Sequence, residues 1–498
     1  MFHISDIKKF KKCPRLYFLN QNSNFEYQPF LRNDEELTDL IIKFLNLDKY
    51  YLGIKGDDKD RIINELDSYE WFVKARFEYN NLRIKIPFLH KCDDGYDIYF
   101  ALYALYPHDD DVEFYRANIW VLENLGFKIN NIYIIHLNAN YILKDKLNVD
   151  ELFLISSNFY NIKNHPSVDI KQKIYQKAFE YNTILKDIEN SSLEVYNAIK
   201  KRACKARGLC QYYYDCFEDE VIFEDDSILN LVSSEHKNEM YKNGIRLLKD
   251  ADINRIEGTR CQYAQIMASR NNGLYFDYYA LKTWLNNLKK PIAFIDFEWE
   301  RYIVPPFNGL KPYDVVCFEY SLHLLDETGK LHHETFIGTH DCREDFIRSL
   351  IKNIPNDATI VAYNAIGAEM LRIKELANQF PKYQDDLNSL NERFVDMSYP
   401  FISGIVYDIK MKGNYSVKSL LNVVSELNYN DLSIHDGMDA VYKWRIIDKE
   451  TDGANFEEIK NSLIEYCSMD SYALYLIYKW LIEIVESKDS EFVNKHKE

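Results

Sequence analysis

The stretch PIAFIDFEWE, residues 291–300, decides how the C-terminal part of the chain folds. Side chains alternate between the two faces of a β-strand, which puts Phe294, Asp296, Glu298 and Glu300 on one face. The first half of the stretch is apolar enough for a central strand, whereas the second half carries carboxylates on a single face. Like charges this close repel one another, and burying an unpaired charge is costly. We therefore expect water or a positive group at this end of the strand.

Length and composition limit the classes of protein to consider. A chain of 498 residues is too long for one core, so two or three domains are expected, and 47% hydrophobic with 28% charged residues is typical of a folded, soluble protein. No apolar stretch follows the charges of MFHISDIKKFKK, so no secretory signal is expected, and no run reaches the ~18 apolar residues of a membrane span. We expect a cytoplasmic protein without a membrane partner. The net charge of −17 argues against coating nucleic acid by bulk charge, but it leaves room for a local basic patch or a metal-bridged phosphate site.

The order of strand-like and helix-like runs predicts an α/β protein with distinct parts. Residues 1–222 mix short strands with helices, including one predicted over residues 165–188. Residues 223–288 are expected to form a helical connector. Residues 289–486 alternate strands and helices, with a hairpin predicted around the turn DETGK at residues 326–330, which is typical of a mixed α/β sheet covered by helices. Residues 487–498 are polar and are expected to fray.

The last predicted helix carries an acid within its buried stripe. Its apolar and aromatic side chains recur at steps of three and four residues. The stripe consists of Ile459, Leu463, Tyr466, Asp470, Leu474, Ile477 and Leu481. An acid in a core-facing stripe needs a partner, and Tyr466 shares a face with Asp470 because it lies four residues earlier.

Another acid, Glu369, follows the predicted strand ATIVAY at the start of the next helix. Open α/β sheets place their sites at such strand ends, so Asp296, Glu298, Glu369 and Asp470 could converge. Four carboxylates suit hard cations such as Mg²⁺ or Mn²⁺. Two such ions ~4 Å apart would hold the attacking water and the leaving oxygen of a phosphodiester. The carboxylates therefore predict a site for two ions at the end of this strand.

These residues resemble the motifs of the DEDD exonucleases, which have a ribonuclease H-like fold. Asp296-Phe-Glu298 matches the Asp-x-Glu of the first strand, and Tyr466-Cys-Ser-Met-Asp470 matches the last motif. The middle motif reads Asn364-Ala-Ile-Gly-Ala-Glu369, with a longer gap, no aromatic residue and Glu in place of Asp. Asp396, in RFVDMSYPF, is the alternative fourth acid.

The resemblance implies a metal-dependent 3′→5′ exonuclease that acts on single-stranded DNA or RNA. It implies that Asp296, Glu298 and Asp470, with Glu369, hold two Mg²⁺ or Mn²⁺ ions, and that Tyr466 orients the attacking water. Lys418, in GNYSVKSLLNVV, either contacts a phosphate or is a solvated lysine at a helix start.

The cysteines form a second pattern. The segment CKARGLCQYYYDC places Cys204, Cys210 and Cys216 with five residues between successive cysteines, and Cys13 lies far upstream. Zinc sites usually pair cysteines at shorter intervals, whereas four thiolates can hold an iron–sulfur cluster. Zinc and ordinary free cysteines remain alternatives. The remaining cysteines are expected to be packing residues: Cys92, Cys261, Cys317, Cys342 and Cys467.

The segment from Ser5 to Arg15 and the split cysteines resemble the iron–sulfur nuclease modules of the RecB-like group, which have the restriction-endonuclease-like PD-(D/E)XK fold and include CRISPR-associated members. The resemblance implies a 4Fe–4S cluster on the four cysteines. The nuclease acids of such a module are missing, because Pro87 stands where the first acid should fall and Phe100-Ala-Leu102 stands where Glu-x-Lys should fall. This module is therefore expected to be inactive and kept for folding or substrate binding.

Basic residues surround both cysteine segments. They could form a patch that binds single-stranded nucleic acid, or they could offset the negative charge of a cluster. The candidate nucleic-acid contacts are Lys11, Lys12, Arg15, Lys201, Arg202, Lys205, Arg207 and Lys418.

The chain as a whole resembles a bacterial family of unknown function that joins a RecB-like iron–sulfur module to a DEDD-type exonuclease domain. Two hypotheses of function follow. The first is the exonuclease described above, in repair or processing of nucleic acid. The alternative is a catalytically inactive iron–sulfur protein that binds nucleic acid or serves as a scaffold, with redox sensing as a further possibility. The sequence contains neither a Walker-type phosphate loop nor a dinucleotide fingerprint.

Overall fold

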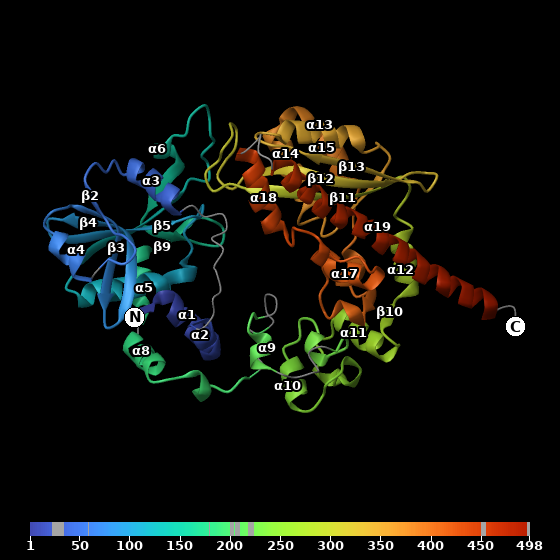
Figure 1. Ribbon diagram of the computed structural model, residues 1–498, viewed down its shortest axis with the longest axis horizontal. Helices are drawn as coiled ribbons and strands as arrows, with labels where there is room; N and C mark the ends of the chain where they lie inside the picture. The colour runs from blue at the N-terminus through green and yellow to red at the C-terminus, as the bar shows by residue number, and fades with distance from the viewer. Residues whose placement is uncertain are drawn as a thin grey trace. The chain divides into compact units, whose positions relative to one another are not determined.

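The computed structural model describes residues 1–21, 34–57, 59–178, 180–199, 204, 210–217, 224–449 and 455–495. The chain divides into two compact units, each of which is coherent by itself (Figure 1). The N-terminal unit comprises Met1–Ile199, Ala203–Phe217 and Tyr302–Tyr313, and the C-terminal unit comprises Lys200–Arg202, Glu218–Arg301 and Asp314–Glu498. The connector predicted over residues 223–288 belongs to the same unit as the C-terminal sheet.

The N-terminal unit is built on a seven-stranded mixed sheet in the order β2-β3-β4-β5-β6-β7, with β1 paired to β4. The pairs β3–β4, β4–β5 and β6–β7 are antiparallel, whereas β1–β4, β2–β3 and β5–β6 are parallel. The strands are β1 Phe2–His3, β2 Tyr50–Leu52, β3 Trp71–Tyr79, β4 Leu82–Cys92, β5 Gly95–Leu102, β6 Ile129–Leu137 and β7 Phe153–Ser156.

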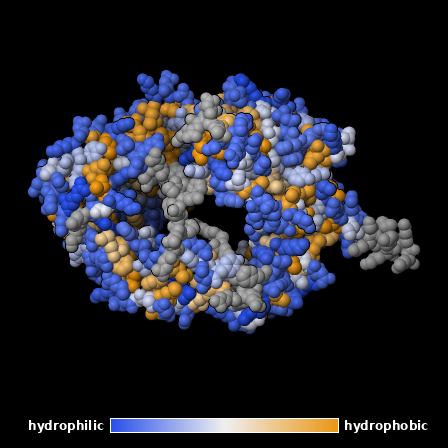
Figure 2. Space-filling model, viewed as in Figure 1, coloured by the Kyte–Doolittle hydropathy of each residue, from blue (hydrophilic) through white to orange (hydrophobic). Residues whose placement is uncertain are grey.

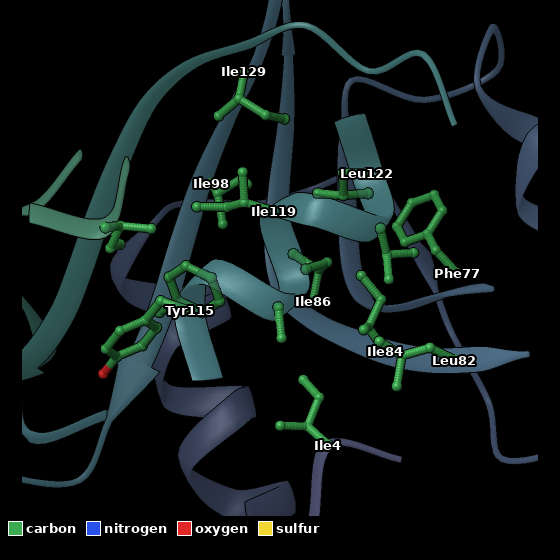
Figure 3. Close-up of a cluster of buried hydrophobic side chains, with 14 of the residues drawn as sticks. Ile4, Phe77, Leu82, Ile84, Ile86, Ile98, Tyr115, Ile119, Leu122 and Ile129 are labelled. Carbon is green, nitrogen blue, oxygen red and sulfur yellow. The ribbon is translucent and has the colours of Figure 1, made fainter. Parts of the chain in front are cut away.

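One face of this sheet packs against α5 and α1 to form the core in Figure 3. Ile86 and Ile98, from β4 and β5, lie against Tyr115 and Ile119 of α5, and Ile4 approaches from α1. These branched side chains suit both a pleated sheet and a closely packed interior. The helices of the unit are α1 Ile4–Lys12, α2 Pro14–Gln21, α3 Asp34–Phe44, α4 Lys59–Glu65, α5 Val112–Asn124, α6 Val149–Leu152, α7 Ile170–Gln176, α8 Tyr181–Glu189 and α9 Tyr213–Cys216.

The helix predicted over residues 165–188 is wrong at its start, and it is interrupted, because α7 ends at Gln176 and α8 begins at Tyr181. A short hairpin, β8 Asn158–Tyr160 with β9 Pro166–Asp169, occupies that position, and α7 begins only at Ile170. Pro166 has a fixed φ and no N–H, which favours extended backbone before it. Asp169 then caps α7, because its side chain accepts a hydrogen bond from the backbone N–H of Gln172 at 2.8 Å.

The C-terminal unit contains a five-stranded mixed sheet in the order β13-β12-β11-β14-β15. Strand β11 is central: β12 pairs with it antiparallel and β14 pairs with it parallel. The predicted hairpin around residues 326–330 is present as β12 and β13, so the predicted mixed α/β architecture is confirmed. The strands of this unit are β10 Leu274–Phe276, β11 Ile292–Arg301, β12 Val315–Leu325, β13 Leu331–Ile337, β14 Thr359–Ala362, β15 Phe394–Asp396 and β16 Val406–Asp408, with β10 paired to β16.

The two faces of this sheet follow from the alternation along β11. Ala293, Ile295 and Phe297 face a core that also contains side chains of α13, α14 and α15. Ile292 and Phe294 face the opposite core, to which α19 contributes Leu474, Ile477 and Leu481. The helices of the unit are α10 Lys237–Lys242, α11 Arg260–Arg270, α12 Tyr278–Leu285, α13 Arg343–Asn353, α14 Glu369–Gln379, α15 Gln384–Asn391, α16 Tyr399–Ile402, α17 Val417–Val424, α18 Gly437–Lys449 and α19 Phe456–Lys495.

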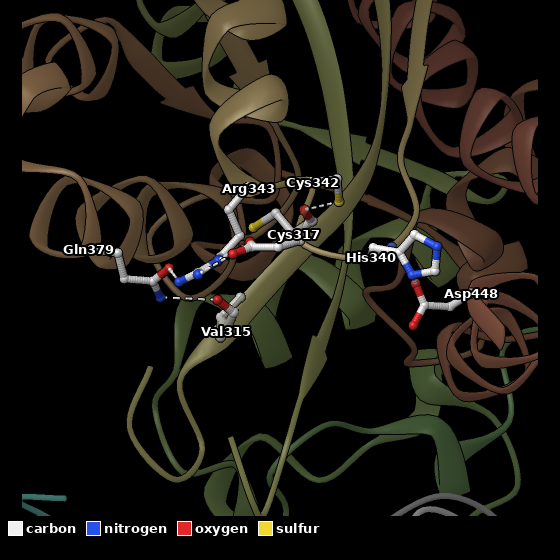
Figure 4. Close-up of polar contacts among 8 residues, drawn as sticks. Val315, Cys317, His340, Cys342, Arg343, Gln379 and Asp448 are labelled. Carbon is white, nitrogen blue, oxygen red and sulfur yellow. Dashed lines mark hydrogen bonds and ion pairs between the residues drawn. The ribbon is translucent and has the colours of Figure 1, made fainter. Parts of the chain in front are cut away.

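A polar network fixes α13 and α14 against the start of β12 (Figure 4). Gln379, the last residue of α14, donates to the backbone carbonyl of Val315 at 3.0 Å and accepts from Arg343 of α13 at 3.1 Å. The Cys342 thiol donates to the Cys317 carbonyl at 3.6 Å. These bonds hold α14 in place, and the first residue of that helix is Glu369.

The polar tail predicted from residue 487 is helical as far as Lys495. Asp489 accepts hydrogen bonds from Lys282 at 2.9 and 3.0 Å, and the hydroxyl of Tyr278 bonds to the same carboxylate. Both partners lie on α12, so a tertiary anchor continues the helix where composition alone predicts fraying.

Within the described residues, no helix combines the length and apolar character needed to cross a membrane. The face in Figure 2 is mostly hydrophilic, with hydrophobic residues in scattered groups.

Candidate functional site

The candidate site begins where β11 turns acidic. Asp296 pairs across the strands with Ser321, and Glu298 pairs with Glu319, so all four side chains lie on the face that α19 covers. A bulge interrupts the pairing between Glu298 and Trp299. Bulges change the direction of neighbouring side chains, and this one separates the acidic segment from the end of the strand.

Helix α19 brings Asp470 to the same place. One ligand oxygen of each of Asp296, Glu298 and Asp470 lies within 4.8 Å of the others. Glu298 is buried, and the two aspartates are half-buried. Residues from a strand and from a helix far along the chain therefore form one carboxylate cluster, which we call the acidic cluster.

The electrostatics of the acidic cluster are unfavourable for three ionised groups. Burial raises the pKa of Asp296 well above its usual range, and the carboxylates of Asp470, Glu369 and Glu298 raise it further. Burial likewise raises the pKa of Glu298. For Asp470, burial raises the pKa to about 6, against the opposing effects of a hydrogen bond from Tyr429 and the charge of Lys418. Neutral carboxylic acids or cations nearby would relieve this repulsion.

Two tyrosine side chains and one lysine side chain lie beside the acidic cluster. The Tyr429 hydroxyl donates to Asp470 Oδ1 at 2.5 Å. The ring of Tyr466 meets that of Tyr429 edge to face, with centroids 6.1 Å apart. The Lys418 ammonium lies 4.8 Å from the Tyr429 ring centre and 5.2 Å from the Tyr466 ring centre, and it also bonds to the His435 carbonyl. Lys418 is thus half-buried, and its charge acts on Glu298 and Asp470.

Tyr466 keeps its proton in this setting. Burial raises its pKa, and the neighbouring charges of Asp470, Glu298 and Asp296 act in the same direction. A neutral phenol can both donate and accept hydrogen bonds. Because all three carboxylates affect the pKa of Tyr466, this residue is a neighbour of the whole acidic cluster.

Glu369 and Asp396, the two candidates for the fourth acid, differ in their surroundings. Asp396 Oδ1 accepts hydrogen bonds from the Asn364 amide at 2.9 Å and from the backbone and hydroxyl of Ser398 at 2.8 and 2.7 Å, so it stabilises a turn. Glu369 is 2% exposed, and its Oε2 has no hydrogen-bond partner among the described residues. Burial raises the pKa of Glu369 to about 8, and Asp396 contributes in the same direction. Glu369 raises the pKa of Asp296 and Glu298, although it lies outside the compact group of three.

Sequence reasoning missed two residues of this site. Glu319 on β12 is 1% exposed, and neither of its carboxylate oxygens has a hydrogen-bond partner among the described residues. Burial raises its pKa, and its charge in turn raises the pKa of Glu298. An acid within the apolar run VVCFEYSLHLL was the available indication. No pattern in the sequence pointed to Tyr429.

The cysteine segments are only partly described, and what is described lies in the N-terminal unit. The Arg15 guanidinium donates to Cys216 Sγ at 3.4 Å and to the Tyr196 carbonyl at 2.8 Å, so the segment after Cys13 lies beside the last cysteine. The backbone amide of Cys210 donates to the Cys204 carbonyl at 2.8 Å.

The predicted nucleic-acid contacts have mixed outcomes. Lys11 pairs with Glu113 and Arg15 with the groups named above, whereas Lys12 is exposed. Four predicted residues lie outside the described part of the chain: Lys201, Arg202, Lys205 and Arg207.

Pro87 and Phe100 lie on β4 and β5, and Phe100 is buried in the hydrophobic core. Cys317, Cys342 and Cys467 are buried, in agreement with the predicted packing role. Cys92 and Cys261 are half-buried, and Cys92 lies beside His90 and Asp97.

Comparisons with known proteins give little further information. A family model described as a domain of unknown function (DUF2779) matches residues 293–416, which contain Asp296, Glu298, Glu369 and Asp396 but not Asp470. The chain is 25% identical over 194 residues to the spermidine/putrescine import ATP-binding protein PotA of Mesomycoplasma hyopneumoniae strain J, covering 36% of this chain and 40% of that protein. PotA of strain 232 is 25% identical over 171 residues, covering 32% and 36%. The chain therefore spans well under half the length of these curated relatives. No solved structure matches.

Proposed function

We propose that the C-terminal unit is a metal-dependent 3′→5′ exonuclease that hydrolyses single-stranded DNA or RNA. The observation that carries the proposal is the acidic cluster, in which Asp296, Glu298 and Asp470 bring their oxygens within 4.8 Å of one another. A mixed sheet whose first strand in chain order carries Asp-x-Glu, covered by a helix that carries Tyr-x-x-x-Asp, also supports the proposed ribonuclease H-like fold.

The donor chemistry fits divalent metal ions. All three ligands are carboxylates, the type that Mg²⁺ and Mn²⁺ prefer. The carboxylates repel one another, and Oε2 of Glu369 has no hydrogen-bond partner in the part of the chain that the structure describes, so added positive charge would stabilise the site. Asp296, Glu298 and Asp470, with Glu369 as the fourth acid, would hold two ions. Two such ions supply an activated water and charge stabilisation at the leaving oxygen.

Protein side chains have separate roles in the proposed reaction. Tyr466 stays protonated and would orient the attacking water through its hydroxyl. The hydrogen bond from Tyr429 at 2.5 Å holds the Asp470 carboxylate in one orientation. Lys418, in contact with both tyrosine rings, would bind a phosphate oxygen of the strand.

The N-terminal unit is proposed as an inactive RecB-like module that grips the strand. Pro87 and Phe100 occupy the positions of the expected nuclease acids, so the unit has no carboxylates there to hold a metal ion. Its four cysteines, Cys13, Cys204, Cys210 and Cys216, are proposed to hold a 4Fe–4S cluster, with Zn²⁺ as the alternative.

The ATP-binding role in the name of the PotA relatives is not carried over to this chain. ATPases of the Walker type cradle phosphates with Gly-x-x-x-x-Gly-Lys-Ser/Thr, and this sequence lacks that motif.

The decisive experiment compares wild type with Asp296→Asn on 5′-labelled single-stranded DNA and RNA, with Mg²⁺, with Mn²⁺ and with chelator. Wild type should give a ladder shortening from the 3′ end in either metal and no cleavage in chelator. Asp296→Asn should lose at least about 100-fold in rate. The matched control is Glu334→Gln, an exposed acid on β13. Intact substrate in every wild-type reaction, together with binding that Asp296→Asn leaves unchanged, would favour the inactive binding or scaffold protein.

A further inference from the structure

The hairpin of β4 and β5 in the N-terminal unit gathers a second set of metal-ligating side chains. His90 and Cys92 are alternate residues of β4, so they point to the same face, and Asp97 lies directly across from His90 on β5. One ligand atom of each lies within 4.8 Å of the others, and all three residues are half-buried. Neither the acidic cluster nor the four cysteines discussed above include any of them.

The distance between the imidazole and thiol ligand atoms fits a tetrahedral zinc site. His90 Nδ1 and Cys92 Sγ are 3.6 Å apart. Bonds of ~2.3 Å to sulfur and ~2.05 Å to nitrogen, at a tetrahedral angle, put the two ligand atoms ~3.6 Å apart. A hydrogen bond between the thiol and the imidazole gives a similar distance, and a zinc ion would replace that bond when the thiol loses its proton.

Neighbouring groups hold the three side chains in place. Asp97 Oδ1 accepts hydrogen bonds from the Asn131 amide at 3.0 Å and from its side chain at 2.9 Å. A bulge in the β5–β6 pairing next to Asp97 brings Asn131 into this position. The Trp71 ring stacks on His90 at 4.3 Å and 17°, which fixes the imidazole plane and leaves its edge free for a ligand bond. Metal ligands commonly have such outer partners.

We propose that His90, Cys92 and Asp97 bind one Zn²⁺ ion. The combination of imidazole, thiolate and carboxylate suits zinc better than Mg²⁺ or Ca²⁺, which take oxygen ligands. Three protein ligands leave a fourth position for water or an external group. Because the ligands come from both strands, the ion clamps the β4–β5 hairpin at its turn.

The test measures zinc stoichiometry on the full chain. Protein stripped with chelator under reducing conditions is reloaded with Zn²⁺ in excess Mg²⁺, desalted and analysed for metal. Cys92→Ser and His90→Ala should each lose one equivalent relative to wild type, whatever the four-cysteine segment holds. Asn131→Ala should weaken binding by about 10–100-fold. Cys261→Ser, a half-buried cysteine of the C-terminal unit, should retain the wild-type content.

A second measurement avoids the use of variants. Zn²⁺ should protect the peptide that contains Cys92 from alkylation in wild-type protein, as read by mass spectrometry, and should leave the Cys261 peptide reactive. Zinc content equal to wild type in both folded ligand variants, or alkylation of Cys92 that Zn²⁺ does not slow, would overturn the proposal.

Discussion

Glu319 offers the sharpest test of the electrostatics, because it is a buried acid whose burial raises its pKa. Its side chain is 1% exposed and neither carboxylate oxygen has a hydrogen-bond partner within the described part of the chain. We expect Glu319→Met, which keeps the length but removes the carboxyl, to raise the free energy of unfolding of the metal-free protein. An unsatisfied buried polar group costs about 1–3 kcal/mol, so we expect Glu319→Met to raise the free energy of unfolding by at least this amount.

The pH dependence adds a second magnitude. Burial raises the folded pKa of Glu319 above its unfolded value of about 4.3, so the folded protein binds the extra proton. Wild type therefore loses stability as pH rises from about 4.3 toward the folded pKa. At about 1.36 kcal/mol per pH unit, this cost is at most about 3.7 kcal/mol at pH 7 and about 1 kcal/mol at pH 5. The gain from Glu319→Met should accordingly be larger at pH 7.

The assay is thermal and urea unfolding in chelator at pH 5 and pH 7. Glu334→Met, an exposed acid on the neighbouring strand β13, is the matched control and should change stability by less than about 0.5 kcal/mol. A destabilised Glu319→Met protein, or a gain that does not grow with pH, would refute the reasoning.

Three further predictions concern the same unit. Tyr466→Phe should slow single-turnover cleavage by about 100-fold without changing oligonucleotide binding, since it removes only the hydroxyl that orients the water. Arg445→Met should lower the free energy of unfolding in urea by about 3–5 kcal/mol, because it leaves the buried Glu300 without its ion-pair partner. Glu300 is 2% exposed and lies 2.6 Å from Arg445. Adding Glu300→Met should recover most of this loss. The Asp470 pKa of about 6 lies above its unfolded value, so Mn²⁺ affinity measured by calorimetry should rise, and metal-free stability should fall, as pH increases through about 4 to 6. An Mn²⁺ affinity that is flat across this range would contradict the last prediction.

Local patterns predicted much of the C-terminal sheet. The alternation in β11, the turn between β12 and β13 and the steps of three and four in α19 are each properties of a single segment. The convergence of Asp296 and Asp470 was also predictable, since an acid on a buried face needs a partner. An apolar face or a buried acid is costly to leave without a neighbour. Such a segment therefore indicates by itself that another segment packs against it.

Other features depend on pairing between segments and could therefore not be predicted from the sequence. Glu319 gains its importance from lying across from Glu298, which a register defines and a sequence does not. The same holds for Asp97, which meets His90 only through the β4–β5 register. Tyr429 reaches Asp470 from a 3-10 helix, Tyr429–Asp431, which is too short to show a periodicity in the sequence.

The acidic cluster also raises the question of how β11 tolerates buried carboxylates. Burial raises the pKa of four acids of this site, and their charges raise the pKa of Asp296 and Glu298 further; the four are Asp296, Glu298, Asp470 and Glu369. The positive charge of Lys418 lowers the pKa of Asp470 and Glu298. A protein that kept these acids only for packing would gain stability by replacing them with apolar residues of similar volume. The proposed metal-dependent function accounts for their presence on the face that α19 covers, because bound cations would recover the stability that the repulsion between carboxylates costs.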